Sequence, residues 1–303
     1  MIREAIMKET RDFLQSIGMP RGDRYDLPDS EKRFPDGAQY RFEVPGIQGP
    51  KAMKALLETI DDYGFYIHRV TQTKGIMMLL DEEIEDMVRL AEKYQVQLVL
   101  AIGPRATYDT SASVHTEEGK RIGYRLRGQE QIVRAIEEVR RASRLGCRHF
   151  IMYDEGCLWV LNEARKAGFI PKECRFKLSA HAGHGNPCSA KLMQTIGADS
   201  LNPVRDIQLQ MLSAIRQAID IPLDIHTENP QSSGGFIRHY EVPEMIRIAA
   251  PIYLKTGGSV AKNHSWDTTA SDAAARAKQV MLVKRVVDAY CPEALYSPKG
   301  SID

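Results

Sequence analysis

Five side chains in this sequence have the clearest capacity for chemistry: Glu43, His181, His226, Glu228 and Lys255. Each lies at or just beyond the end of a short run of β-branched or aromatic residues, a pattern that predicts a strand. Carboxylate and imidazole groups exchange protons and bind metals, and a lysine amine becomes a nucleophile once it loses its proton. Their shared position predicts that they meet at one end of a sheet.

Three of these residues form a candidate metal site. His226 and Glu228 are separated by one residue in the run HTE, which places them on the same side of an extended strand. With His181 they offer two imidazoles and one carboxylate, a ligand set that suits zinc, manganese or iron. In this hypothesis the metal activates a water molecule for hydrolysis and Glu43 is the general base. A catalytic hydrogen-bonding role for His181 without a metal stays open.

Lys255 supports two further hypotheses. It ends a hydrophobic run and precedes Gly257 and Gly258, which would let a ligand approach the backbone. If neighbouring cations lower its pKa, its amine can form a Schiff base, as in a lyase or aldolase acting on a phosphorylated or carboxylated carbonyl compound. If it stays charged, it pairs with Glu43 or Glu228, or binds the negative group of a substrate. A barrel that binds a small molecule without chemistry is the remaining alternative.

Two glycine-containing segments, 231–236 and 255–260, follow the last two predicted strands. Backbone amides at these two positions often hold phosphate in βα barrels. Further polar residues follow other predicted strands at the same edge of the sheet. The predicted substrate-binding residues are Arg105, Asn202, Arg205, Ser233, Gly234, Gly257 and Gly258. This set predicts a small anionic or amide-bearing substrate.

Eight predicted strands position these residues: 40–44, 65–70, 97–102, 149–154, 175–180, 199–202, 222–227 and 252–256. Each is followed by a segment of helical periodicity, such as residues 81–94 with their acidic first turn. Right-handed crossovers close eight such units into a (βα)8 TIM barrel of about 250 residues. An open doubly wound sheet is the rival, but no GxGxxG follows the first strand, so we also expect no nucleotide cofactor.

Side-chain alternation along these strands places charged groups inside the barrel, where Val, Ile and Leu are usual. The inner positions include Arg41, Lys177 and Asp224. Burial of an unpaired charge is costly, so we expect these residues to form ion pairs in the lower layer of the barrel. The upper layer, at the carboxyl ends of the strands, is the expected position of the site.

Two segments lie outside the eight-fold repeat. Residues 1–36 contain a helical segment and a stretch rich in Pro, Gly and Asp, and we expect them to wrap the outer ring or to close the bottom of the barrel that residues 37–303 form. The third connection, 103–127, is much longer than the usual about 2–6 residues and is rich in Arg, Lys and Tyr. It is either a lid over the catalytic face or a surface insertion.

Length and composition exclude several classes of protein. The chain has 303 residues, of which 43% are apolar and 27% charged, and this favours one large α/β domain over a disordered chain. A net charge of +1 predicts no general attraction to nucleic acid or to a membrane surface. No apolar run is long enough for a bilayer span or a secretory signal. Five scattered cysteines without CxxC predict reduced thiols. We expect a cytoplasmic protein with a small-molecule substrate, either alone or as a homo-oligomer.

Residues 175–290 resemble the collagenase-like peptidase family of unknown catalytic type. The segments that carry the resemblance read KLSAHAGHGNPCSAKLMQTIGADSLNP, PLDIHTE, YLKTGGS and KRVVDAY. The resemblance implies a TIM barrel, a peptidase-like hydrolase and a site that includes His226 and Lys255. The family's cysteine-containing signature is absent, since QSSGGF stands at the corresponding place. We therefore expect no iron–sulfur cluster.

Overall fold

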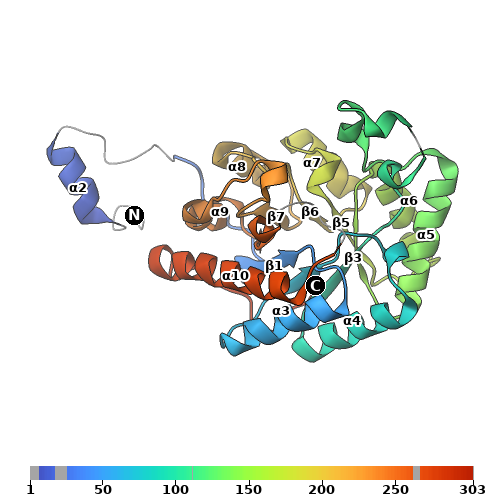
Figure 1. Cartoon of the computed structure of the whole chain (residues 1–303). Coiled ribbons are helices and arrows are strands. Elements are labelled where there is room, and N and C mark those ends of the chain that lie inside the picture. The colour runs from blue at the N-terminus through green and yellow to red at the C-terminus, as the bar shows by residue number, and fades with distance from the viewer. Residues whose placement is uncertain (1–6, 18–25, 111, 262–266, 303) are drawn as a thin grey trace.

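Eight parallel strands form a closed barrel surrounded by helices in the computed structural model of the chain (Figure 1). The structure describes residues 7–17, 26–110, 112–261 and 267–302. The strands are β1 (Tyr40–Pro45), β2 (Arg69–Thr71), β3 (Gln97–Ala101), β4 (His149–Met152), β5 (Arg175–Leu178), β6 (Ser200–Leu201), β7 (Leu223–His226) and β8 (Ile252–Lys255). They pair in chain order, and β8 pairs with β1 to close the ring. The predicted TIM barrel is confirmed.

The outer helices follow the predicted segments closely: α3 (Pro50–Asp62), α4 (Asp81–Tyr94), α5 (Gly128–Arg144), α6 (Glu155–Lys166), α7 (Pro187–Ile196), α8 (Leu209–Ala218), α9 (Val242–Ala249) and α10 (Ala270–Tyr290). Thr269 caps α10, because its side chain accepts from the backbone N–H of Asp272 while the Asp272 carboxylate accepts from the backbone N–H of Thr269. Helix α10 packs against α3, so the last helix of the ring lies beside the first (Figure 1). In the described part of the chain, no helix is long and apolar enough to cross a membrane.

Strand β2 differs from its prediction, which covered residues 65–70. The residues before Arg69 are not in the sheet, because Phe65 and Tyr66 stack on the ring of Tyr296 with centroids 5.5 and 5.1 Å apart. The strand therefore begins later and extends to Thr71. Arg69 and Thr71 both lie in the barrel interior, where they donate to Asp224 and Glu43.

The N-terminal segment contains the predicted helix, α2 (Lys8–Ser16), and none of its residues is buried. Much of the rest of the predicted extension, residues 1–6 and 18–25, lies outside the described residues. The following stretch closes the bottom of the barrel, one of the two predicted positions. The backbone N–H of Ser30 donates to the carbonyl of Arg247 at 2.8 Å, and the Phe34 ring packs edge-on against Tyr253.

The barrel interior has an apolar side and a charged side. On the apolar side four inward residues form a small cluster. They are Val99 and Ala101 on β3, Ile151 on β4 and Tyr153 just after β4. The other strands contribute mainly charged and polar inner residues, all buried, among them Glu43, Lys177 and Asp224. The large apolar core lies instead between the sheet and the helices, for example at Phe42 and Leu254. The sheet is thus stabilised from outside, and its interior is left for polar groups.

Candidate functional site

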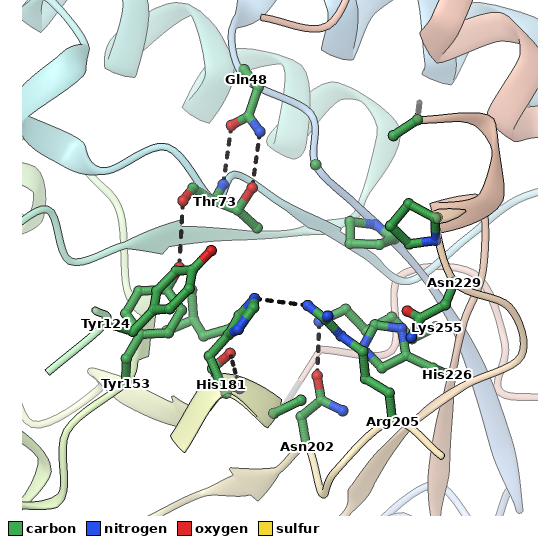
Figure 2. A pocket seen from close by; sticks show the side chains of 18 of the residues that line it. Gln48, Thr73, Tyr124, Tyr153, His181, Asn202, Arg205, His226, Asn229 and Lys255 are labelled. Carbon is green, nitrogen blue, oxygen red and sulfur yellow. Dashed lines mark hydrogen bonds between the residues drawn. The ribbon is translucent and has the colours of Figure 1, made fainter. Parts of the chain in front are cut away.

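A cavity opens at the carboxyl ends of the strands, the end at which TIM-barrel enzymes carry their active sites. Asn202, His226 and Lys255, which end or directly follow β6, β7 and β8, are among its lining residues (Figure 2). Its other polar or aromatic lining residues include Tyr124, Tyr153, His181, Arg205, Asn229 and Arg276. The described residues that line this cavity include three basic side chains and no carboxylate. The cavity therefore suits a ligand with negative charge.

Lys255 is held in place by two neighbours. Its Nζ donates to Oδ1 of Asn202 at 2.9 Å and lies 3.5 Å from Oε1 of Glu43. The side chain is 5% exposed. Burial, followed by the positive charge of Lys177, lowers the pKa of Lys255 to about 7, although Glu43 opposes the shift. Near neutral pH a large share of this amine is therefore unprotonated, as a nucleophilic lysine requires.

Glu43 lies beneath Lys255 and is fully buried. Lys177 donates to its Oε2, and Thr71 donates to Oε1 at 2.8 Å. Burial alone would raise the pKa of Glu43, but Lys177, Lys255 and Arg69 together hold it well below its ordinary value. An ionised carboxylate that several cations share is a weak proton acceptor, so this geometry gives little support to Glu43 as a general base.

The lower layer contains the ion pairs that the sequence predicts, with one correction. Asp224 accepts from Arg69 at 2.6 Å and lies 3.2 Å from Nζ of Lys177. Lys177 thus bridges Asp224 and Glu43. Arg41 does not join this group, since its ion pair is with Asp36, 3.2 Å away on the segment that closes the barrel bottom.

His226 lines the cavity next to Lys255, with which it is paired in register between β7 and β8. It is 6% exposed. Neither ring nitrogen has a hydrogen-bond partner within the described part of the chain. Burial, followed by the charge of Lys255, holds the pKa of His226 well below its ordinary value, so the imidazole is neutral at physiological pH. A buried imidazole without protein partners can exchange a proton with a ligand in the cavity.

His181 forms part of the cavity wall rather than an extension of β5. The strand ends at Leu178, and His181 lies in a short 3₁₀ turn, Ala180–Ala182. Its Nε2 is 2.7 Å from Nη2 of Arg205, and the Tyr124 ring stacks on the imidazole with centroids 3.8 Å apart (Figure 2). Because a guanidinium only donates, Nε2 of His181 must accept in this contact. That lone pair is then occupied.

The structure does not bring the predicted metal ligands together. Strand β7 ends at His226, and beyond it the chain turns so that the Glu228 carboxylate accepts from the backbone N–H of Gly257 and, at 2.8 Å, from the Ser259 hydroxyl. Nε2 of His239 lies 3.1 Å from the same carboxylate. Within the described residues, no three His, Cys, Asp or Glu side chains form a group that could hold a metal ion. The prediction failed because alternation of side chains applies only while the chain stays extended.

The two predicted anion-binding loops differ in their role. Gly258 lines the cavity, whereas Ser233 and Gly234 are not among the described residues that do. Gly257 has φ +98°, and a side chain there would meet Arg276, whose Cβ would be 2.9 Å from the added Cβ. Arg276 donates to the carbonyls of Gly257 and Pro45 at 2.8 and 2.9 Å. This glycine is therefore required for packing against the cation rather than for direct contact with a ligand.

Arg105 is the clearest correction among the predicted substrate-binding residues. It is 2% exposed, and it donates to the carbonyls of Ile102 and Gly103 at 3.2 Å. Its guanidinium lies 4.5 and 4.6 Å from the ring centroids of Tyr108 and Tyr153. Arg105 therefore supports the base of the long third connection and does not line the cavity. The connection itself contains three short 3₁₀ turns, Ala106–Tyr108, Ala112–His115 and Gly119–Ile122, and contributes Tyr124 to the wall.

Two residues that line the cavity, Tyr153 and Arg276, and one deeper in the barrel, Arg69, were not identified as candidates from the sequence. Tyr153 follows the strand-forming run of β4 in inward register, so alternation is a signal that could have found it. Arg69 lies within the predicted strand 65–70, but no inward positions were predicted for that strand. Arg276 lies on α10, far along the chain, and nothing in the local pattern indicates that its side chain reaches the barrel mouth.

Comparison with known proteins assigns neither a family nor a reaction. No family model matches the sequence, and no curated protein matches it. Similar solved structures include a U32 peptidase, with 17% identity over 68% of this chain and 74% of that chain at a TM-score of 0.42. A putative lyase/mutase from Burkholderia cenocepacia has 12% identity, with 84% of each chain covered, at a TM-score of 0.44. The δ-aminolevulinic acid dehydratase of Toxoplasma gondii has 14% identity over 65% of this chain and 72% of that chain at 0.42. Similarity at this level carries no argument about function.

Proposed function

We propose that this chain is a lyase or aldolase that forms a Schiff base between Lys255 and a small carbonyl compound with a carboxylate or phosphate group. The observation that carries the proposal is the environment of the Lys255 amine. It is buried at the cavity with Lys177 as a second cation, and its pKa is lowered to about 7. A lysine that binds anions by charge needs no such shift, whereas a nucleophilic lysine does.

The chemistry follows from the groups around the amine. The Lys255 nitrogen attacks the carbonyl carbon, a C–N bond forms, and the carbonyl oxygen leaves as water after it takes up two protons. The positive iminium nitrogen then accepts the electron pair of the bond between the α and β carbons as that bond breaks, which leaves an enamine on the lysine side. The β carbon leaves as an aldehyde, because its hydroxyl loses a proton in the same step. His226 is the neutral imidazole best placed to move these protons. Arg205 and Arg276 supply positive charge for the anionic group of the substrate.

Peptidase-like hydrolysis is the contrasting hypothesis, because residues 175–290 resemble a peptidase family. Its metal-dependent form needs His181, His226 and Glu228 to share one ion. The carboxylate of Glu228 is instead satisfied by Gly257 and Ser259, and Nε2 of His181 by Arg205. The hydrolytic proposal therefore has less support from the geometry than the Schiff-base proposal.

Borohydride trapping separates the two proposals. The full-length protein is incubated at pH 7.5 with pyruvate, glyoxylate or glyceraldehyde 3-phosphate, reduced with sodium borohydride and analysed by peptide mass spectrometry. We expect a stable adduct on Lys255 with at least one probe and none in Lys255→Arg, which keeps the charge but cannot form an imine. Lys166→Arg, a surface substitution, is the matched control and should leave the adduct unchanged. No adduct with any probe, together with cleavage of amide substrates, would reverse the assignment.

A further inference from the structure

A second cavity lies at the opposite, amino-terminal end of the barrel. Its lining includes Arg69, Gln97, Arg175 and Lys177 from the strands, and Arg33 from the segment that closes the barrel bottom. We call it the lower cavity. A TIM barrel normally fills this part of its interior with branched apolar side chains. Packing of the barrel interior therefore does not explain why four basic residues line a cavity at this position.

Two of the basic residues, Arg33 and Arg175, have no acidic partner among the residues that the structure describes. Arg33 donates at 2.7 Å to the carbonyls of Ser30 and Lys32, and Arg175 donates at 3.2 and 3.3 Å to the carbonyls of Lys172 and Cys174. Within the described part of the chain neither forms an ion pair with a carboxylate. Both residues line the lower cavity, Arg33 at an exposed and Arg175 at a partly exposed position, so each adds positive charge at its wall.

The two carboxylates that line the lower cavity do not supply the missing charge. Asp199 is paired with Arg165 at 2.7 Å, and Asp220 with Lys32 at 2.7 Å. Deeper in the barrel, Arg69 and Lys177 are already balanced by Glu43 and Asp224. The net electrostatic character of the lower cavity is therefore positive.

A buried amide donor provides a second, independent indication. Gln97 is 2% exposed and lines the lower cavity. Its Oε1 accepts from Arg69 at 2.8 Å and from the Tyr253 hydroxyl at 3.2 Å, and these two contacts fix the orientation of the amide. Its Nε2 has no partner among the described residues. A buried donor without a partner is destabilising, and a ligand oxygen would satisfy it.

We propose that the lower cavity binds a small polyvalent oxyanion of the phosphate class. Guanidinium groups match phosphate oxygens in geometry as well as in charge, and Arg33 and Arg175 both have donors for this role. Gln97 adds a neutral donor from the barrel interior. Because this site lies at the other end of the barrel from Lys255, it does not depend on the proposed Schiff-base chemistry.

Calorimetric titration of the full chain with inorganic phosphate tests the proposal. The upper cavity, with Arg205 and Arg276, is also basic, so two separable binding events are expected. In the Arg33→Gln/Arg175→Gln double variant we expect the affinity of one event to fall at least about tenfold, as loss of charge-assisted hydrogen bonds implies. Arg205→Gln should weaken only the other event.

Arg148→Gln is the matched control. Arg148 lies at the same end of the barrel, and it too donates to main-chain carbonyls, those of Ser143 and Cys147, but it does not line the lower cavity. Its substitution should leave both events unchanged. A tungstate soak of crystals should place an anomalous peak beside Arg175 and Gln97. Unchanged phosphate binding in the double variant, an equal loss in Arg148→Gln, or tungstate at the upper cavity alone would each overturn the proposal.

Discussion

Oε1 of Glu43 lies 3.5 Å from Nζ of Lys255, yet the two residues are not an isolated ion pair. They are direct partners in the register of β1 and β8, so the backbone fixes their separation. The same carboxylate also accepts from Lys177, and Arg69 lies 3.6 Å from its Oε2. The buried Glu43 carboxylate therefore contacts three cations, Lys177, Lys255 and Arg69. The pKa of Lys255 falls to about 7 in this setting.

Removal of the shared anion should destabilise the protein and lower the pKa of Lys255 further. In Glu43→Gln, Lys177 and Arg69 lose one of the two carboxylates that they both contact, and a broken buried pair costs about 3–5 kcal/mol. Because Glu43 raises the pKa of Lys255, its loss should move the acidic limb of the pH–rate profile to lower pH. Denaturant unfolding measures the loss of stability, and the pH–rate profile measures the shift in the pKa of Lys255. Glu137→Gln, at an exposed pair, is the control, and equal stability of the two variants would contradict the prediction.

The rate of adduct formation should follow the free amine of Lys255. We expect the rate to rise with pH through an apparent pKa near 7, because only the unprotonated amine attacks. The charge of Lys177 contributes to the lowered value, so Lys177→Met should move the limb to higher pH. Lys166→Met should not move it. A limb near the ordinary lysine value in the wild type would show that the amine is not activated.

Lys255→Met should be more stable than the wild type at neutral pH although it is inactive. The folded-state pKa of about 7 lies below the ordinary value of 10.5. Between these values the unfolded chain binds the proton and the folded chain does not, so wild-type stability rises with pH across this window. At pH 7 removal of the amine should give a net gain of about 1–3 kcal/mol, since loss of the bond to Asn202 offsets part of it. The gain should shrink towards pH 10; a constant difference from pH 7 to 10 would argue against it.

Tyr124 should affect substrate affinity through its ring. The ring stacks on His181 at 3.8 Å and forms part of the cavity wall contributed by the third connection. Such a stack is worth about 0.5–1.5 kcal/mol, so Tyr124→Ala should raise KM about 2- to 12-fold. Tyr124→Phe keeps the stack and should stay near the wild-type value. An equally raised KM in both variants would assign the effect to the hydroxyl, and a wild-type KM in both would remove Tyr124 from the binding site.

Arg105 should prove to be a support for the third connection rather than a substrate ligand. Arg105→Lys keeps the charge but loses the planar group that lies over Tyr108 and Tyr153 and bonds to Ile102 and Gly103. We expect faster proteolytic cleavage within 103–127, measured at low protease concentration. Arg127→Lys, at an exposed position outside these contacts, should resemble the wild type. Normal protease resistance combined with a raised KM in Arg105→Lys would restore the substrate-binding role.

The sequence by itself determined the barrel and most of its inner faces. Helical and strand periodicities are local patterns, so the alternation of eight units could be identified without any knowledge of contacts. Alternation within each strand also placed Glu43, Lys177, Asp224 and Lys255 inside correctly, since an extended chain directs every second side chain to the same face.

Only the tertiary structure decided which of these groups act together. Glu228 leaves the cavity because the chain is no longer extended beyond His226, and its carboxylate is satisfied by the loop that follows β8. Arg69 is held in the interior by its bonds to Gln97 and Asp224, which lie on two other strands. Arg276 reaches the barrel mouth from α10. The pKa of Lys255 depends on Lys177, Glu43 and burial, which are far apart in sequence and meet only when the barrel closes, and no local pattern encodes that distance.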